Sequence, residues 1–179
     1  QEIIHSETVS PPYDNQEYFN YTKLNWSRMN RWLKTGQLSE GIKSIVAKIE
    51  EHQNWIVITE PWCGDAAHIV PFIQMIARLN DKISISFELR DSEPYRIEQY
   101  LTNGKSKSIP KLIIQNNIGA DLAVWGPRPL ACQKLVDELN AQNLSFDKLK
   151  TALQHWYNKD EGKEIMSELS ALIIETTKN

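Results

Sequence analysis

The sequence predicts an α/β protein with a central mixed β-sheet flanked by helices, and with extra helices at both ends. Three observations predict this class. Short β-branched runs alternate with stretches of helical spacing. The central elements follow the order strand, helix, strand, helix, strand, strand, helix, which requires a mixed sheet with helices on both faces. Helical patterns also precede and follow this block. A length of 179 residues suits one domain with added elements.

Residues 1–52 are predicted to form an N-terminal helical extension. Gln1–Pro12 shows little periodicity and is expected to be an extended arm. A helix is expected from Asp14, as its cap, to Lys34, with Gly36 ending it, and a second helix begins at Ser39. The aromatic side chains of the first helix are expected to pack in the core, and the alternative is that some of them line a substrate groove.

Residues 53–142 are predicted to form the core. The cluster of apolar, β-branched residues at Trp55–Thr59 indicates a buried strand, and the spacing after Asp65 indicates a helix. The remaining core elements are expected at 83–89 (strand), 95–101 (short helix), 111–115 and 120–125 (a hairpin of two strands) and 129–140 (helix), the last with Leu130 facing inward.

Residues 143–179 are predicted to form a C-terminal extension of two helices. Ser145 caps the first, and the pattern breaks at 158–162 before the second begins. Both extensions are expected to pack on the core, so that residues 1–179 form one domain.

Composition excludes several classes of function. A net charge of −3 argues against nucleic acid as the main partner, because phosphate binding needs a concentrated basic surface. No apolar run reaches the length of a membrane span, and the amino terminus lacks the pattern of a secretory signal. Two cysteines do not make a disulfide framework, so a reducing, cytoplasmic setting is expected.

Cys63 is the candidate nucleophile. It follows the strand Trp55–Thr59 and lies at the first turn of the next helix. Unpaired backbone N–H groups and the helix dipole favour a thiolate there. A thiolate is the attacking group in thiol–disulfide exchange. Asp65 opposes this effect, because a nearby carboxylate raises the pKa of a thiol.

Two separated motifs resemble the thioredoxin superfamily. Trp62-Cys63-Gly64 matches the start of its Trp-Cys-Gly-Pro-Cys signature, and Pro71 stands at the helix proline eight positions after the cysteine. Ile109-Pro110 matches the family's cis-proline loop. The resemblance implies a thioredoxin-like fold across roughly residues 55–140. Within the superfamily, the chain is most similar to a subgroup with the motif W-C-G-D-A, followed later by S-I-P-K and W-G-P-R-P.

The departures from the family pattern concern redox chemistry. Ala66 replaces the second cysteine, Asp65 the intervening proline, and Val57 the buried acid. The resemblance therefore implies a monothiol thiol–disulfide oxidoreductase in which Cys63 forms a mixed disulfide with glutathione or a protein thiol. Glutathione would be a co-substrate, and no resident cofactor is expected. Cys132 is expected to lie too far from Cys63 to act as the thiol that resolves this mixed disulfide.

The resemblance also places a substrate groove around Cys63. Its expected substrate-binding residues are Trp62, Gly64, Asp65, Ala66, Ile109 and Pro110. The backbone before Pro110 would pair with a bound peptide or glutathione in β fashion. The alternative is a redox-inactive module that holds a peptide or a partner protein in the same groove.

Other polar residues have weaker claims. His68 is either a general base or a histidine with satisfied hydrogen bonds, and Glu60 is a candidate proton relay. Lys105, Lys107 and Arg128 could make the groove positive. No residues stand at zinc-ligand spacing, so no metal is expected, although monothiol relatives offer the analogy of an iron–sulfur cluster.

Overall fold

A computed structural model describes residues 14–177. The elements are the helices α2 (Gln16–Thr35), α3 (Glu40–Val46), α4 (Gly64–Ala77), α5 (Leu130–Ala141), α6 (Phe146–Asp160) and α7 (Lys163–Thr176), the 3₁₀ helix η1 (Arg96–Gln99), and the strands β1 (Gln53–Thr59), β2 (Ile83–Leu89), β3 (Lys111–Asn116) and β4 (Asp121–Trp125). The predicted α/β class with a mixed, helix-flanked sheet is confirmed.

The sheet has four strands in the order β2-β1-β3-β4. β1 runs parallel to β2 and antiparallel to β3, and β3 pairs antiparallel with β4. β1 is an inner strand whose apolar residues are almost wholly buried, which explains its continuous run of β-branched and aromatic residues. The antiparallel neighbour β3 brings the loop before it to the end of the sheet where α4 begins.

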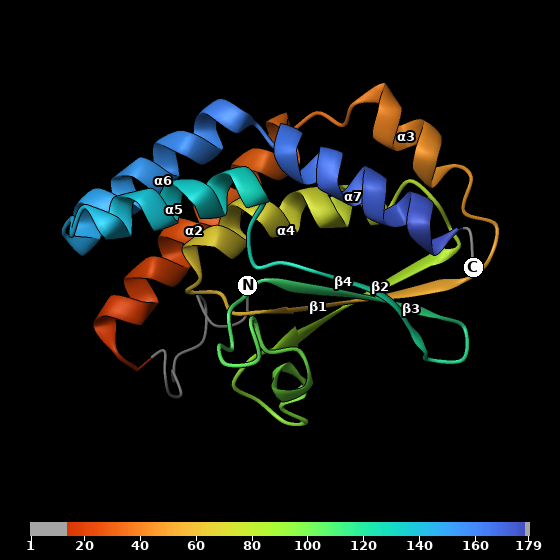
Figure 1. Cartoon of the computed structure of the whole chain (residues 1–179), viewed down its shortest axis with the longest axis horizontal. Coiled ribbons are helices and arrows are strands. Elements are labelled where there is room, and N and C mark those ends of the chain that lie inside the picture. Colours follow the sequence, from red (N-terminus) through yellow and green to blue (C-terminus); the bar gives the residue numbers. More distant parts are fainter. Residues whose placement is uncertain (1–13, 178–179) are drawn as a thin grey trace.

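The α-helices gather on one side of the sheet, and the connection from β2 to β3 lies on the other (Figure 1). That connection contains η1, where the sequence predicted a short helix over 95–101. Ile97 is fully buried, so a single 3₁₀ turn supplies the apolar cover that a longer helix was expected to give. Within the described residues, the second face of the sheet is therefore covered by this connection and its 3₁₀ helix, while the α-helices lie on the first.

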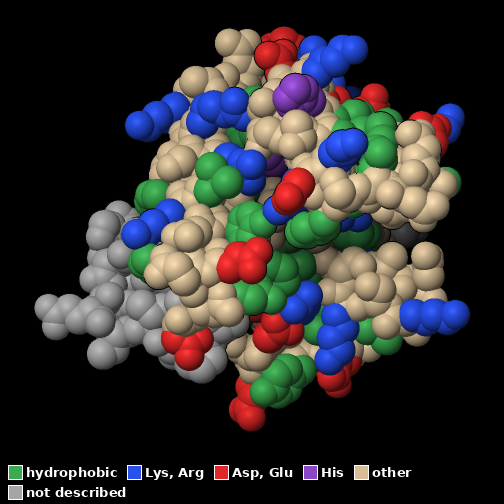
Figure 2. Space-filling view, turned by 90° about the vertical axis from the view of Figure 1, so that its left-hand side faces the viewer, with side chains coloured by type: hydrophobic (Ala, Val, Ile, Leu, Met, Phe, Trp, Pro, Cys, Tyr) green, Lys and Arg blue, Asp and Glu red, His purple; other side chains and the backbone are tan. Residues whose placement is uncertain are grey.

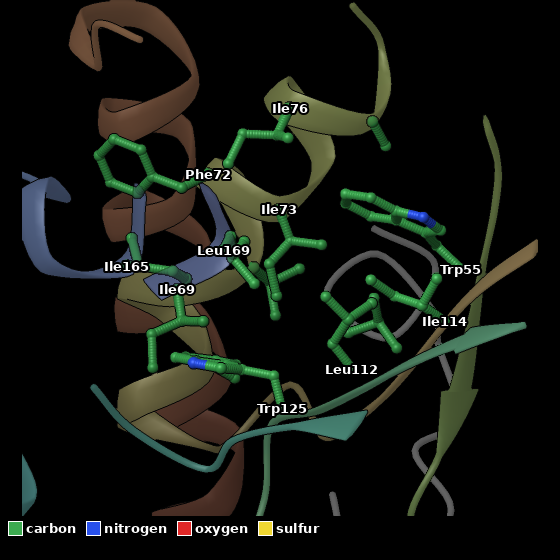
Figure 3. Packing of buried hydrophobic residues seen from close by; sticks show 14 of the residues in the cluster. Trp55, Ile69, Phe72, Ile73, Ile76, Leu112, Ile114, Trp125, Ile165 and Leu169 are labelled. Carbon is green, nitrogen blue, oxygen red and sulfur yellow. The ribbon is translucent and has the colours of Figure 1, made fainter. Parts of the chain in front are cut away.

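One core joins the sheet to the helices above it. Trp55, Leu112 and Trp125 from the strands face Ile69, Phe72 and Ile73 of α4, and Ile165 and Leu169 of α7 fill the same space (Figure 3). α7 contacts both β4 and α4. A helix from the predicted C-terminal extension thus packs directly on the sheet, while α2 packs on the outer side of α4.

Two details of the helix ends differ from the sequence prediction. Asn15 is the N-cap of α2, with its side chain accepting a hydrogen bond from the Glu17 N–H at 2.9 Å, so Asp14 does not have this role. Leu130 is 77% exposed because it lies on the outward side of the first turn of α5. The expected arm at residues 1–12 lies outside the described residues.

Candidate functional site

Cys63 lies at the N-cap of α4, directly after the turn that leaves β1. Its N–H donates to the Glu60 carbonyl at 3.0 Å, which closes this turn. The side chain is 8% exposed, and Sγ donates to the Ile109 carbonyl at 3.5 Å. The structure therefore brings the two predicted motifs together, with the thiol against the backbone before Pro110. The Ile109–Pro110 peptide bond is cis.

The thiol of Cys63 is protonated in this setting. Burial raises its pKa first, and the Asp65 carboxylate raises it further. The backbone N–H groups of Ala66 and Asp65 lower the pKa, as expected at a helix N-terminus, and so does Arg128. Burial outweighs them and brings the pKa to about 12. The helix end thus lowers the pKa of Cys63 as expected, but its effect is smaller than that of burial.

Asp65 is held on both carboxylate oxygens. Tyr157 Oη donates to Oδ1 at 2.7 Å, and Arg128 Nη2 lies 2.6 Å from Oδ2. The Asp65 side chain is 11% exposed. The carboxylate predicted to contact substrate thus ties the start of α4 to α6 and to the segment before α5, and its strongest contacts are internal.

Tyr157 joins Asp65 to the second cysteine. The Tyr157 hydroxyl also interacts with the Cys132 sulfur, and this interaction lowers the pKa of Cys132 against the effect of burial. Cys132 is fully buried, and burial raises its pKa to about 12. Both cysteines are free. Cys132 is therefore linked to Asp65 through one tyrosine, although it forms no disulfide with Cys63.

His68 is a buried histidine with satisfied hydrogen bonds. Trp32 Nε1 donates to its Nδ1 at 2.9 Å, and the ring stacks on Tyr157 at a centroid distance of 4.6 Å. The remaining ring proton then belongs on Nε2, on the side where Gln154 interacts. Burial lowers the pKa of His68 to about 3, so it stays neutral and is not the general base of this site.

Trp62 covers the turn before Cys63. Tyr18 meets its ring edge-on at 5.5 Å, and the Arg90 guanidinium lies 4.8 Å from the ring centroid. Arg90 is paired with Asp91 at 2.6 Å. The buried Glu60 accepts a hydrogen bond from the Asp91 N–H at 3.1 Å, so it anchors the segment after β2 beside the turn.

The loop around Pro110 is supported from two sides. A Cβ on Gly126, whose φ is +116°, would lie 2.3 Å from the Pro110 carbonyl oxygen, so only glycine fits there. Lys111 is buried, and its Nζ donates to Thr102 Oγ1 at 2.7 Å. Burial lowers the pKa of Lys111. These contacts hold the loop whose Ile109 carbonyl accepts the hydrogen bond from the Cys63 thiol.

A groove of about 620 Å³ passes over Cys63. α2 and α6 form its upper walls, and the loop before Pro110 and the segment before α5 complete it. Figure 2 views the end of the molecule where this groove lies and shows hydrophobic side chains gathered among basic and acidic ones. Its lining combines aromatic, apolar and cationic side chains, which include Tyr18, Tyr21, Arg28, Trp62, Cys63, Arg90, Lys107, Ile109, Arg128, Phe146, Leu149, Lys150 and Leu153.

The groove contains part of the predicted site. Trp62, Gly64, Asp65 and Ile109 line it with Cys63, as do Lys107 and Arg128. Ala66 and Pro110 are buried and do not line it, because the first turn of α4 directs Ala66 into the core. The residues from α6 were missed by sequence reasoning. The aromatic spacing in α2 was the available signal for Tyr18 and Tyr21.

Comparisons with known proteins identify the family. A family model described as Thioredoxin matches residues 12–142. The chain belongs to the thioredoxin family. The matched range runs through α2 and α3 and ends with α5, so α6 and α7 follow the part of this thioredoxin-family chain that the model covers. No curated protein sequence matches the chain.

Two solved structures resemble this thioredoxin-family chain. An HIV epitope-scaffold is 16% identical, with a TM-score of 0.58 over 88% of this chain and 89% of that one. A protein of unknown function from Pseudomonas aeruginosa is also 16% identical, with a TM-score of 0.55 over 92% of this chain and 86% of that one. At this identity the likeness shows the fold alone.

Within residues 14–177, no helix combines the length and the apolar composition of a membrane span. No group of three His, Cys, Asp or Glu side chains in that range is placed to hold a metal ion.

Proposed function

We propose that this thioredoxin-family chain is a binding protein that holds an extended peptide segment of a partner protein in the groove over Cys63. The observation that carries this proposal is the placement of the thiol. Cys63 lines an open groove, but it is only 8% exposed and its Sγ donates to the Ile109 carbonyl at 3.5 Å. Burial also raises the pKa of this thiol, so the sulfur serves as part of the groove wall and not as a nucleophile.

The groove suits a peptide in size and in lining. Its volume of about 620 Å³ lies within the range typical of ligand sites. Aromatic and apolar side chains from both walls offer contacts for peptide side chains, and they include Tyr18, Tyr21, Phe146 and Leu153. The backbone at Ile109 lies at the floor, where an extended segment can run alongside it.

The pH dependence of alkylation tests the state of Cys63. Iodoacetamide labelling rates are measured from pH 6 to 10, and peptide mapping by mass spectrometry assigns the label to Cys63 or Cys132. We expect a Cys63 rate that is still rising at pH 10, above the ordinary thiol pKa of about 8.5. We also expect no mixed disulfide after incubation with oxidised glutathione. A rate midpoint below about 7.5, the upper end of the activated range, contradicts the proposal.

Monothiol exchange is the second candidate, and one observation favours it. The backbone N–H groups of Ala66 and Asp65 at the start of α4 lower the pKa of Cys63, and such groups stabilise a thiolate once one forms. In this mechanism the Cys63 thiolate attacks one sulfur of glutathione disulfide, a new S–S bond forms, and glutathione thiolate leaves. A second glutathione thiolate then releases Cys63. Two free cysteines fit the reducing, cytoplasmic setting that this chemistry needs.

Restoring the missing cysteine tests this second candidate. Ala66→Cys places a thiol one turn after Cys63, and exchange chemistry predicts a gain of insulin-disulfide reduction with dithiothreitol as reductant. Ala67→Cys is the matched control, because its neighbouring position is equally buried but is not that of the family's second cysteine. If correctly folded Ala66→Cys gains no more activity than Ala67→Cys, the thiol of Cys63 is not placed for exchange and the binding function stands.

A further inference from the structure

Positive charge dominates the lining of the groove. Among the described residues it has five cationic side chains, Arg28, Arg90, Lys107, Arg128 and Lys150, and two carboxylates, Glu17 and Asp65. Four of the cations have a carboxylate partner within 3 Å: the pairs are Arg90–Asp91, Lys107–Glu98, Arg128–Asp65 and Lys150–Asp147. Arg28 has no carboxylate partner in residues 14–177.

Arg28 is held in place by a neutral group. Its Nη1 donates to Asn25 Oδ1 at 3.0 Å, and Asn25 Nδ2 donates to the Pro61 carbonyl at 3.0 Å. Asn25 is 1% exposed, so this link is rigid and fixes the guanidinium relative to the turn that carries Cys63. An amide orients the cation without neutralising it, and the remaining N–H donors of Arg28 stay available to the groove.

The surroundings of Arg28 favour an anion. The side chain is half-buried, and both burial and the neighbouring Arg31 lower its pKa, which shows that its charge is poorly compensated. The positive charge of Arg28 also helps to lower the pKa of the neighbouring His68. Three groove atoms are buried without a hydrogen-bond partner among the described residues: the donors Trp62 Nε1 and Arg128 Nε, and the acceptor Gln154 Oε1. Two of these three atoms are donors, so the groove offers a ligand more unpaired donors than acceptors.

We propose that Arg28 forms an anion subsite of this groove and that the bound peptide places an Asp or Glu carboxylate on its guanidinium. Arginine is suited to this contact because its planar fork matches a carboxylate in two parallel hydrogen bonds. This inference rests on the proposed binding function and adds the chemical class of the partner segment to it.

A random 12-residue peptide library displayed on phage tests the subsite. It is selected against the intact chain, against Arg28→Gln and against Arg31→Gln. Arg31 is the matched control, because it lies one turn further along α2, donates to Asn158 and does not line the groove. Thermal unfolding checks that both variants fold.

The expected result has three parts. Wild type and Arg31→Gln select peptides with Asp or Glu at one fixed position, and Arg28→Gln loses this preference. A selected peptide perturbs the amide resonances of Trp62 and Ile109. Replacing its acidic residue with Gln weakens binding to wild type about tenfold, and leaves binding to Arg28→Gln unchanged.

The contrary outcomes separate the two proposals. If wild type selects peptides without an acidic residue, or if Arg28→Gln keeps the preference, the anion subsite is wrong and the binding function stands. If wild type enriches no peptides above an albumin control, both are wrong.

Discussion

Cys63 and Cys132 have equally raised pKa values but different surroundings. Both are raised to about 12, and burial is the largest cause in each case. Cys132 is fully buried beside α6, and the Tyr157 hydroxyl lies close enough to its sulfur to lower its pKa. Cys63 lines the groove, donates to a backbone carbonyl and lies at a helix N-terminus whose backbone N–H groups lower its pKa.

This difference shows which of the two thiols should change its pKa when a single neighbouring residue is substituted. Burial is the largest cause of the raised pKa of Cys132, and the charges of Asp65 and Asp160 add smaller contributions. For Cys63, the charge of Asp65 is the second-largest cause of the raised pKa after burial. The backbone N–H groups at the N-terminus of α4 act in the opposite direction. A helix N-terminus does not guarantee a thiolate, because the desolvation of a buried sulfur can exceed what the local backbone supplies.

The largest effect is expected at the support beneath the Cys63 acceptor. Gly126→Ala should lower the free energy of unfolding by about 3 kcal/mol, because the new Cβ would overlap the Pro110 carbonyl at a φ that disfavours alanine. Urea denaturation measures this loss. Displacement of Ile109 should also increase labelling of Cys63 and leave Cys132 unlabelled.

Gly119→Ala is the matched control for Gly126→Ala. It has a similarly positive φ of +81° but open space around the added Cβ, so we expect a cost of about 1 kcal/mol. Equal losses in the two variants would show that backbone conformation alone, and not contact with the Pro110 loop, requires glycine at Gly126.

A smaller effect is expected from removing the charge beside Cys63. Asp65→Asn should lower the pKa of the Cys63 thiol and raise its alkylation rate at pH 8 about tenfold. Arg128→Gln breaks the same ion pair but removes a cation, so it should raise that pKa and slow the reaction. Rates that change in the same direction in both variants would assign the effect to the lost pair, not to the charge of Asp65.

The smallest effect is expected at the link between the two cysteines. Tyr157→Phe removes the hydroxyl that joins Cys132 to Asp65 and should cost about 1 kcal/mol of unfolding free energy. Tyr100→Phe removes an exposed hydroxyl that donates to Asp121, and we expect a smaller loss on thermal or urea denaturation. If Tyr157→Phe has the same urea midpoint of unfolding as the wild type, the buried hydrogen bond from Tyr157 to Asp65 does not contribute to stability.

Sequence patterns predicted the fold better than the site. The buried run at Trp55–Thr59 and the helical spacing after Asp65 placed β1 and α4 because hydrophobic periodicity depends on local geometry. The same periodicity predicted a helix in α7, but it does not specify what the buried face meets. Its place directly on β4 therefore could not be read from the sequence.

The candidate site depends on long-range contacts. The cysteine and the Ile109–Pro110 loop were found from their motifs. The raised pKa of Cys63 was not, because it follows from how completely the assembled chain excludes water from the sulfur. Tyr157 and Arg28 reach the groove from helices far away in sequence, and no local pattern marks such a residue as part of a site.

The wall supplied by α6 has a consequence for biosynthesis. The ribosome completes the cysteine turn, the sheet and α5 before it adds α6, which carries the hydroxyl that Asp65 accepts from and one whole side of the groove. A nascent chain halted before residue 146 therefore has no ligand-binding surface of the mature shape. Under the binding function proposed above, recognition of a partner would begin only when α6 has emerged and packed against the rest of the groove.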